Sequence, residues 1–238
     1  MDGNGTTGSG AAAAEPRVFM ALPGRTEAGP EAFEACLAEV VRCLGLTVAP
    51  GPDGDPLRTW RHRARTALRA ACRRGTVLSE ESFDALLRAA VHDPDPSFNR
   101  QFVEPALNAF GYRRVRLALL GHLRTGTDRE RAGAARAWYW TALPLRMTLV
   151  RAADPTALDG TAPGDDRAVL VAEWNEAALR EFVANEAIDV RRCILPLLPL
   201  RRSAYPPELH ALVDVAVATA RSHPDAYLRH RVEHQVGD

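Results

Sequence analysis

The sequence predicts an all-α fold in which helical hairpins stack side by side. Ala and Leu dominate its apolar residues, and aromatic residues make up only 6% of the 238 residues, a bias that favours helices. Apolar residues recur at helical spacing along most of the chain. Acidic turns also recur, since Asp95 and Asp128 lie 33 residues apart and Asp189 and Asp225 lie 36 apart. Such a period is typical of helical-hairpin repeats.

The N-terminal part of the chain is expected to differ from this regular array. Residues 1–16 are mostly Gly, Ser, Thr and Ala, a composition that predicts a disordered tail. Residues 17–78 are predicted to form a divergent helical cap. Its first helix begins at Pro30, and the break APGPDGDP separates it from a second helix that begins at Leu57.

Residues 79–238 are predicted to form four hairpins. The expected helix pairs are 79–91 with 97–111, 112–124 with 128–143, 173–185 with 187–200, and 207–222 with 226–237. Thr127 and Glu130 have the spacing of a capping box, and Pro105 and Pro196 should kink the second helices that contain them. The segment 152–167, which is rich in Asp, Gly and Pro, predicts a flexible insertion between the second and third hairpins.

Three of these segments resemble HEAT repeats: DPSFNRQFVEPALNAFG, IDVRRCILPLL and DAYLRHRVEHQVG. In such repeats a turn Asp precedes a Val-Arg-like pair that opens the second helix, as Asp189, Val190 and Arg191 do here. The resemblance covers about residues 80–236, although Asp128 is followed by RERAGAAR without the Val. It implies a right-handed α-solenoid whose second helices line a concave face. It implies no particular reaction, because such repeats serve mostly as scaffolds.

The expected function is that of a non-catalytic, cytoplasmic interaction or scaffold module that binds a protein or peptide on the concave face. The run WYW at 138–140 is one candidate contact, because successive helix residues point about 100° apart and three aromatic rings cannot all face a core. The other candidates are cations near the starts of second helices. The full set of candidate binding residues is Arg100, Arg131, Trp138, Tyr139, Trp140, Arg191, Arg192 and Arg229.

Cations in the first turn of a helix lie at the unfavourable end of the helix dipole, so these arginines need an explanation. They could pair with the turn acids Asp95, Asp128, Asp189 and Asp225, or they could contact a partner. We expect a mixed outcome. Arg191 should be structural, while Arg192 should contact the partner together with Tyr139 or Trp140.

Nucleic-acid binding is the alternative function, and base excision by a DNA glycosylase is one form of it. The helix that begins at Leu57 carries Arg58, Arg65, Arg69 and Arg73 on the face opposite its apolar stripe, and such a face could neutralise phosphates. A glycosylase would also need a carboxylate in a basic, aromatic groove, for which Trp140, Arg136 and Glu104 are the available residues. The formal net charge of +0 disfavours this alternative.

Other chemistry is weakly signalled. The order of His230, Glu233 and His234 is that of a zinc-binding H-x-x-E-H motif. A third ligand is missing, and an upstream residue such as His223 or Asp225 has no support as that ligand. We therefore expect no metal and no cofactor. The four cysteines form no C-x-x-C pair, and the absence of Lys excludes a Walker lysine. The sequence has no run of about 18 apolar residues, so no membrane span is predicted.

Overall fold

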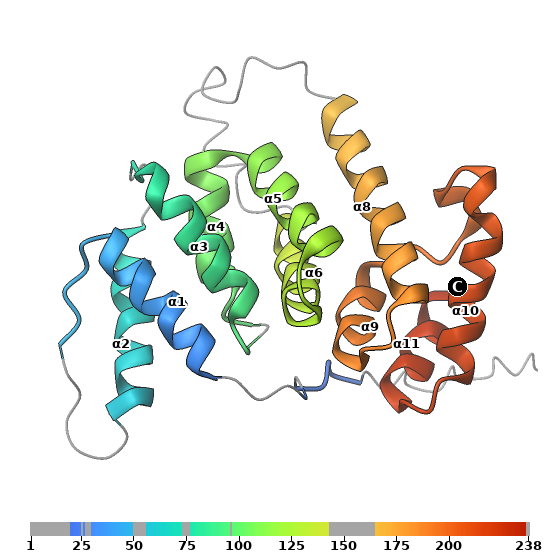
Figure 1. The fold of residues 1–238 in the computed structure, drawn as a ribbon, viewed down its shortest axis with the longest axis horizontal. Coiled ribbons are helices and arrows are strands. Elements are labelled where there is room, and N and C mark those ends of the chain that lie inside the picture. The colour runs from blue at the N-terminus through green and yellow to red at the C-terminus, as the bar shows by residue number, and fades with distance from the viewer. Residues whose placement is uncertain are drawn as a thin grey trace, which may run out of the picture.

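A computed structural model describes residues 20–24, 26, 30–49, 56–72, 77–95, 97–142 and 165–236. These residues contain ten α-helices and three short 3-10 helices, and none of them is in a strand (Figure 1). The all-helical part of the predicted fold class is therefore confirmed. No described helix is long and apolar enough to cross a membrane.

Within the described residues the helices follow one another in pairs. Their bounds are α1 Pro30–Cys43, α2 Pro56–Ala71, α3 Glu80–His92, α4 Arg100–Phe110, α5 Tyr112–Thr125, α6 Asp128–Ala142, α8 Asp165–Ala184, α9 Ile188–Ile194, α10 His210–Ser222 and α11 Ala226–Val236. The 3-10 helices are η1 Leu195–Leu197, η2 Arg202–Ala204 and η3 Pro207–Leu209. The predicted helix pairs thus correspond to α3/α4, α5/α6, α8/α9 and α10/α11.

The packing of the helices arranges them in two rows. In the first row α1 packs on α3, α3 on α5, α5 on α8, and α8 on α10. In the second row α2 packs on α4, α4 on α6, α6 on α9, and α9 on α11. Each hairpin therefore contacts mainly its neighbours along the chain. The two helices before residue 79 form a first hairpin at one end of the rows, and α10/α11 lie at the other end (Figure 1).

Local sequence explains where several helices begin and end. Thr127 and Glu130 form the predicted capping box: the backbone N–H of Thr127 donates to Glu130 Oε2 at 2.8 Å, and the N–H of Glu130 donates to Thr127 Oγ1 at 3.3 Å. Gly111 joins α4 directly to α5 with a φ of 80°, a conformation that favours Gly because it has no Cβ.

Two predicted boundaries were wrong. Pro196 does not kink a long second helix, because α9 already ends at Ile194 and Pro196 lies in the 3-10 helix η1. The helix expected from residue 173 begins at Asp165, because Leu170 extends the buried stripe of Trp174 and Ala178 by one turn. The last three residues of the predicted insertion 152–167 are therefore helical. The rest of that insertion, and the predicted tail 1–16, lie outside the described residues.

The core runs through all five hairpins. Its largest fully buried side chains include Phe33 of α1, Phe102 of α4 and Phe182 of α8. The four cysteines are free thiols, and Cys193 is buried while the other three are half-buried. Gly133 of α6 lies tightly against α3, where a Cβ would overlap the carbonyl oxygen of Val91.

Residues 20–24 and 26, which we call the N-terminal strap, lie against α9 and α11. The backbone N–H of Met20 donates to His230 Nε2 of α11 at 3.2 Å. Thr26 donates both its backbone N–H and its hydroxyl to Asp189 Oδ2 of α9, at 2.7 and 3.0 Å. The strap appears as the dark-blue segment at the bottom of Figure 1. It joins the N-terminal part of the chain to the last two hairpins.

Candidate functional site

Three of the eight predicted binding residues lie together, where the start of α4 meets the end of α6. The guanidinium carbon of Arg100 lies over the Trp140 ring, 5.4 Å from its centroid. Tyr139 meets the same Trp140 ring edge-on, with 5.1 Å between centroids. Tyr139 is 40% exposed and Arg100 is partly exposed. We call these three residues the aromatic–arginine cluster.

A buried amide holds the cluster in place. Asn99 Oδ1 accepts the indole N–H of Trp140 at 2.5 Å. Asn99 precedes α4, where Asn commonly caps a helix, but its side chain makes no cap hydrogen bond and binds Trp140 instead. Arg100 is oriented by Glu104, one turn further along α4, at 3.2 Å. Sequence reasoning named Glu104 only for a glycosylase and missed Asn99, because its partner lies 41 residues away.

Trp138, the first residue of the WYW run, belongs to the core. Its ring stacks on Trp174 of α8, with 4.0 Å between centroids and 4° between planes, and both indoles are buried. The run thus divides as helical geometry requires: Trp138 faces the core, Tyr139 faces solvent and Trp140 lies between them.

The arginines near the starts of α6, α9 and α11 reach back to the first helix of their own hairpins. Arg131 Nε donates to the carbonyl of Leu123 at 3.3 Å, and Arg191 Nε donates to the carbonyl of Phe182 at 3.2 Å. Arg229 Nη1 donates to the carbonyl of His223 at 2.6 Å. Leu123 and Phe182 lie in the last turns of α5 and α8, where carbonyls lack partners within the helix, and His223 directly follows α10. Arg131 also pairs with Asp128 at 3.2 Å.

Arg192, expected to be the arginine free for a partner, is held by an ion pair. Its Nη2 donates to Asp225 Oδ2 in the next hairpin at 2.5 Å, and its Nη1 lies 3.8 Å from Asp189. The expected ion pair between Asp95 and Arg100 is also replaced by other contacts. Asp95 Oδ1 accepts the backbone N–H of Ser97, while Arg100 pairs with Glu104.

The predicted phosphate-binding face of α2 is interrupted, because Arg65 points into the core. Arg65 is 8% exposed, pairs with Asp93 at 2.8 Å and lies over the rings of Phe33, Phe98 and Phe102. Its assignment to the solvent face was wrong. Arg58 and Arg69 are exposed, and Arg73 lies outside the described residues.

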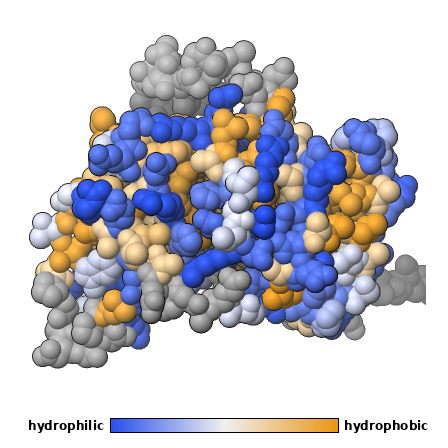
Figure 2. Space-filling view, viewed as in Figure 1, coloured by the Kyte–Doolittle hydropathy of each residue, from blue (hydrophilic) through white to orange (hydrophobic). Residues whose placement is uncertain are grey.

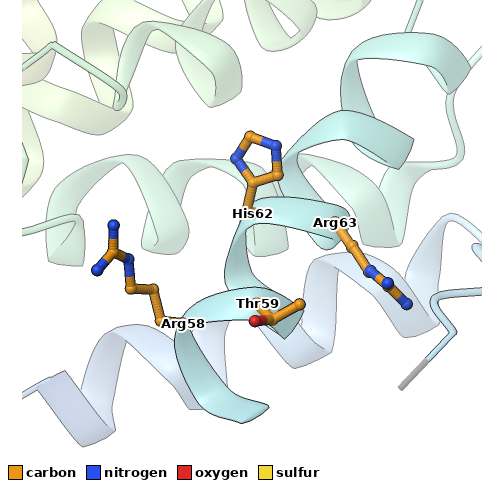
Figure 3. Close-up of a pocket in the computed structure, with 4 residues that line it drawn as sticks. All are labelled: Arg58, Thr59, His62 and Arg63. Carbon is orange, nitrogen blue, oxygen red and sulfur yellow. The ribbon is translucent and has the colours of Figure 1, made fainter. Parts of the chain in front are cut away.

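The arginine side chains of α2 do not converge on the hollow beside this helix. It is lined by Arg58, Thr59, His62 and Arg63, and Figure 3 shows Arg58 and Arg63 pointing to opposite sides of the helix. Arg63 Nη1 donates to the carbonyl of Ala49 at 3.3 Å. The hollow therefore lacks a convergent set of donors for one phosphate.

The H-x-x-E-H residues lie on α11, where Glu233 is exposed and both histidines are half-buried. The rings of His230 and His234 are in contact, with 4.3 Å between centroids, but Glu233 pairs with Arg221 of α10 at 3.0 Å. His223 Nδ1 accepts the backbone N–H of Asp225. Among the residues that the structure describes, no three His, Cys, Asp or Glu side chains are grouped to hold a metal ion.

Hydrophilic side chains cover much of the face shown in Figure 2, with smaller hydrophobic patches between them. Comparison with protein-family models, curated proteins and solved structures found no match to this chain. The contacts, burial and charge described above are therefore the basis for inferring a function.

Proposed function

We propose that the chain is a HEAT-like α-solenoid that acts as a non-catalytic interaction module and binds a protein or peptide through the aromatic–arginine cluster. The observation that carries this proposal is the grouping of Arg100, Tyr139 and Trp140, in which an exposed ring and a partly exposed cation flank an indole fixed by Asn99. Trp, Tyr and Arg are the residues most enriched among those that dominate the energy of protein interfaces.

The cluster also has the rigidity that a binding surface needs. Trp140 is held by a hydrogen bond to the buried Asn99, and Arg100 by Glu104, so little side-chain entropy is lost when a partner binds. Arg100 can attract an acidic side chain of the partner, while Tyr139 offers apolar area with a polar hydroxyl. The two-row packing of the hairpins supports the solenoid part of the proposal.

A pulldown from the native organism, followed by affinity measurements on the recovered partner, tests the proposal. Tyr139→Ala and Arg100→Glu should each weaken binding at least about tenfold, in line with the loss of about 1.4 kcal/mol or more that is usual at such positions. Val215→Ala of α10 and Arg180→Glu of α8 are matched controls, because both positions are exposed and lie outside the cluster.

Equal affinities for the cluster variants and the controls would contradict the proposal. A salt-dependent affinity for DNA that is lost in Arg58→Ala and Arg69→Ala, but retained in Tyr139→Ala, would support nucleic-acid binding in its place. Circular dichroism of each variant confirms that the helical fold is retained, so that a lost fold is not mistaken for a lost contact.

A further inference from the structure

A second cationic site lies where the start of α5, the end of α6 and the start of α8 meet. Arg116 of α5 is 5% exposed, and its guanidinium carbon lies 5.6 Å from the Tyr112 ring centroid and 5.0 Å from that of Trp138. Arg167 of α8 lies over the same Tyr112 ring at 4.7 Å. Two guanidinium groups thus share one aromatic side chain.

Arg116 is fixed in position without being neutralised. Its Nε donates to Thr141 Oγ1 at 3.3 Å, and its Nη2 donates to the carbonyl of Thr141 at 2.8 Å. Both acceptors are uncharged groups at the end of α6, where the helix dipole supplies only about half of a negative charge. Arg116 Nη1 is buried without a hydrogen-bond partner.

No carboxylate among the described residues lies within ion-pair distance of Arg116 or Arg167, whereas eleven other arginines there have one. A buried charge is unfavourable unless it is paired, and a second cation beside it adds repulsion. Burial and the neighbouring Arg167 both lower the pKa of Arg116. Two guanidinium groups therefore lie at one aromatic ring, and one of them has a buried N–H without an acceptor.

We infer that Arg116 and Arg167 bind a phosphate group beside Tyr112. A phosphate monoester or inorganic phosphate carries a charge of about −1.5 to −2 at neutral pH, which matches two guanidinium groups, whereas a single carboxylate neutralises only one. The free N–H of Arg116 would donate to one phosphate oxygen. Arg167 is exposed and Tyr112 is half-buried, so a ligand can approach from the Arg167 side. This site is separate from the aromatic–arginine cluster and does not depend on its function.

Calorimetric titration of the full chain with inorganic phosphate, O-phospho-L-serine and acetate at equal ionic strength tests this inference. Arg167→Gln is the main variant, because its side chain is exposed and its loss leaves the core intact. It should weaken phosphate binding at least about tenfold, because a charged hydrogen bond and a formal charge are both lost. Arg180→Gln, the same change further along α8, should bind as the wild type does.

Binding of either phosphate compound, with loss in Arg167→Gln and retention in Arg180→Gln, supports the site. Preference for phosphoserine would mean that the phosphate is recognised on an organic carrier, and equal binding would mean that the free anion suffices. The inference is overturned if neither compound binds at millimolar concentration, if acetate binds equally well, or if Arg167→Gln and Arg180→Gln bind alike. Arg116→Gln, where circular dichroism shows it folded, should reproduce the loss.

Discussion

Two Asp–Arg ion pairs join neighbouring hairpins at opposite ends of the molecule, with the same connectivity but a different balance of forces. In each, an arginine of a second helix reaches the turn acid of the next hairpin: Arg65 of α2 pairs with Asp93 at 2.8 Å, and Arg192 of α9 pairs with Asp225 at 2.5 Å. The Asp93 carboxylate is fully buried, whereas Asp225 retains some exposure.

The difference lies in how each carboxylate is hydrogen-bonded. Asp225 uses both oxygens, since Oδ2 accepts from Arg192 and Oδ1 accepts the backbone N–H of Leu228. Asp93 accepts from Arg65 and from the backbone N–H of Asp95 on the same oxygen, and its Oδ2 is buried without a partner. Burial therefore outweighs Arg65 and raises the pKa of Asp93. At Asp225 burial acts in the same direction, but the combined hydrogen bonds and charges of its neighbours lower the pKa. A short Arg–Asp distance therefore does not by itself determine whether the pKa of the carboxylate is lowered.

The largest expected effect comes from removing the arginine of the buried pair. Arg65→Ala should lower the free energy of unfolding by about 3–5 kcal/mol, because it leaves the buried Asp93 unpaired and removes the cation from three phenylalanine rings. Arg192→Ala should lower it by about 1–3 kcal/mol. Urea denaturation of both variants measures the difference. An Arg65→Met, Asp93→Leu double variant should recover much of the loss, and a smaller loss for Arg65→Ala than for Arg192→Ala would break the comparison.

The contact between α3 and α6 depends on close backbone packing at Gly133. Gly133→Ala should destabilise the fold by about 1–3 kcal/mol or more, because the new Cβ would overlap the Val91 carbonyl. Gly121→Ala in α5 is the control, since Gly121 is exposed and has nothing within 4 Å of a Cβ. It should raise stability by roughly 0.5–1 kcal/mol through helix propensity. Melting temperatures that move in the same direction would contradict this.

A pH series should separate the two ion pairs by sign. The pKa of Asp225 is lower in the folded state than the usual 3.8, so its contribution is present above 3.8 and is lost as the pH falls through the folded pKa. The pKa of Asp93 is raised above 3.8, so the folded state gains protons there and stability decreases as the pH rises from 3.8 through the folded pKa. Relative to Asp225→Asn, the wild type should therefore gain stability as the pH rises toward 3.8, and relative to Asp93→Asn it should lose stability as the pH rises above 3.8. Parallel slopes would show that the two carboxylates are equivalent.

The smallest expected effect concerns a third turn acid, Asp189, which accepts two hydrogen bonds from Thr26 of the N-terminal strap. Thr26→Ala should lower the free energy of unfolding by about 0.5–1.5 kcal/mol, because the hydroxyl hydrogen bond is lost while the backbone N–H remains. Thr66→Ala provides the control, since the Thr66 hydroxyl donates only to a carbonyl of its own helix. Equal losses in thermal denaturation would mean that the strap contact contributes nothing specific.

Most of the helices could be predicted from the sequence because their signals are local. Apolar spacing and turn residues predicted α1 to α6, α10 and α11 closely, and the Thr127–Glu130 capping box was confirmed. The start of α8 and the end of α9 were misplaced, because a charged stretch at 165–167 and the residues around Pro196 were assigned by composition. Aromatic geometry indicated that one residue of the WYW run reaches the surface, and Tyr139 does.

The contacts that distinguish one arginine from another could not be predicted, because they join residues distant in sequence. Arg65 lies on the polar side of its helix by spacing alone, and only Asp93, 28 residues later, explains why it is buried. Arg192 was expected to be free for the same reason, since its partner Asp225 lies 33 residues away. The N-terminal strap has no periodic pattern, so nothing in its sequence pointed to Asp189 or His230.

The strap changes how the array can come apart. A row of hairpins that touch only their neighbours can fray from either end, one unit at a time. Here Met20 contacts His230 and Thr26 contacts Asp189, 210 and 163 positions further along the chain. The segment before the first hairpin is therefore bound to the last two hairpins. Opening the last hairpin therefore also breaks the contact of Met20 with His230, while Thr26 remains bound to Asp189 of the preceding hairpin. These contacts require a long loop to form during folding, so the contacts that couple the two ends should form late.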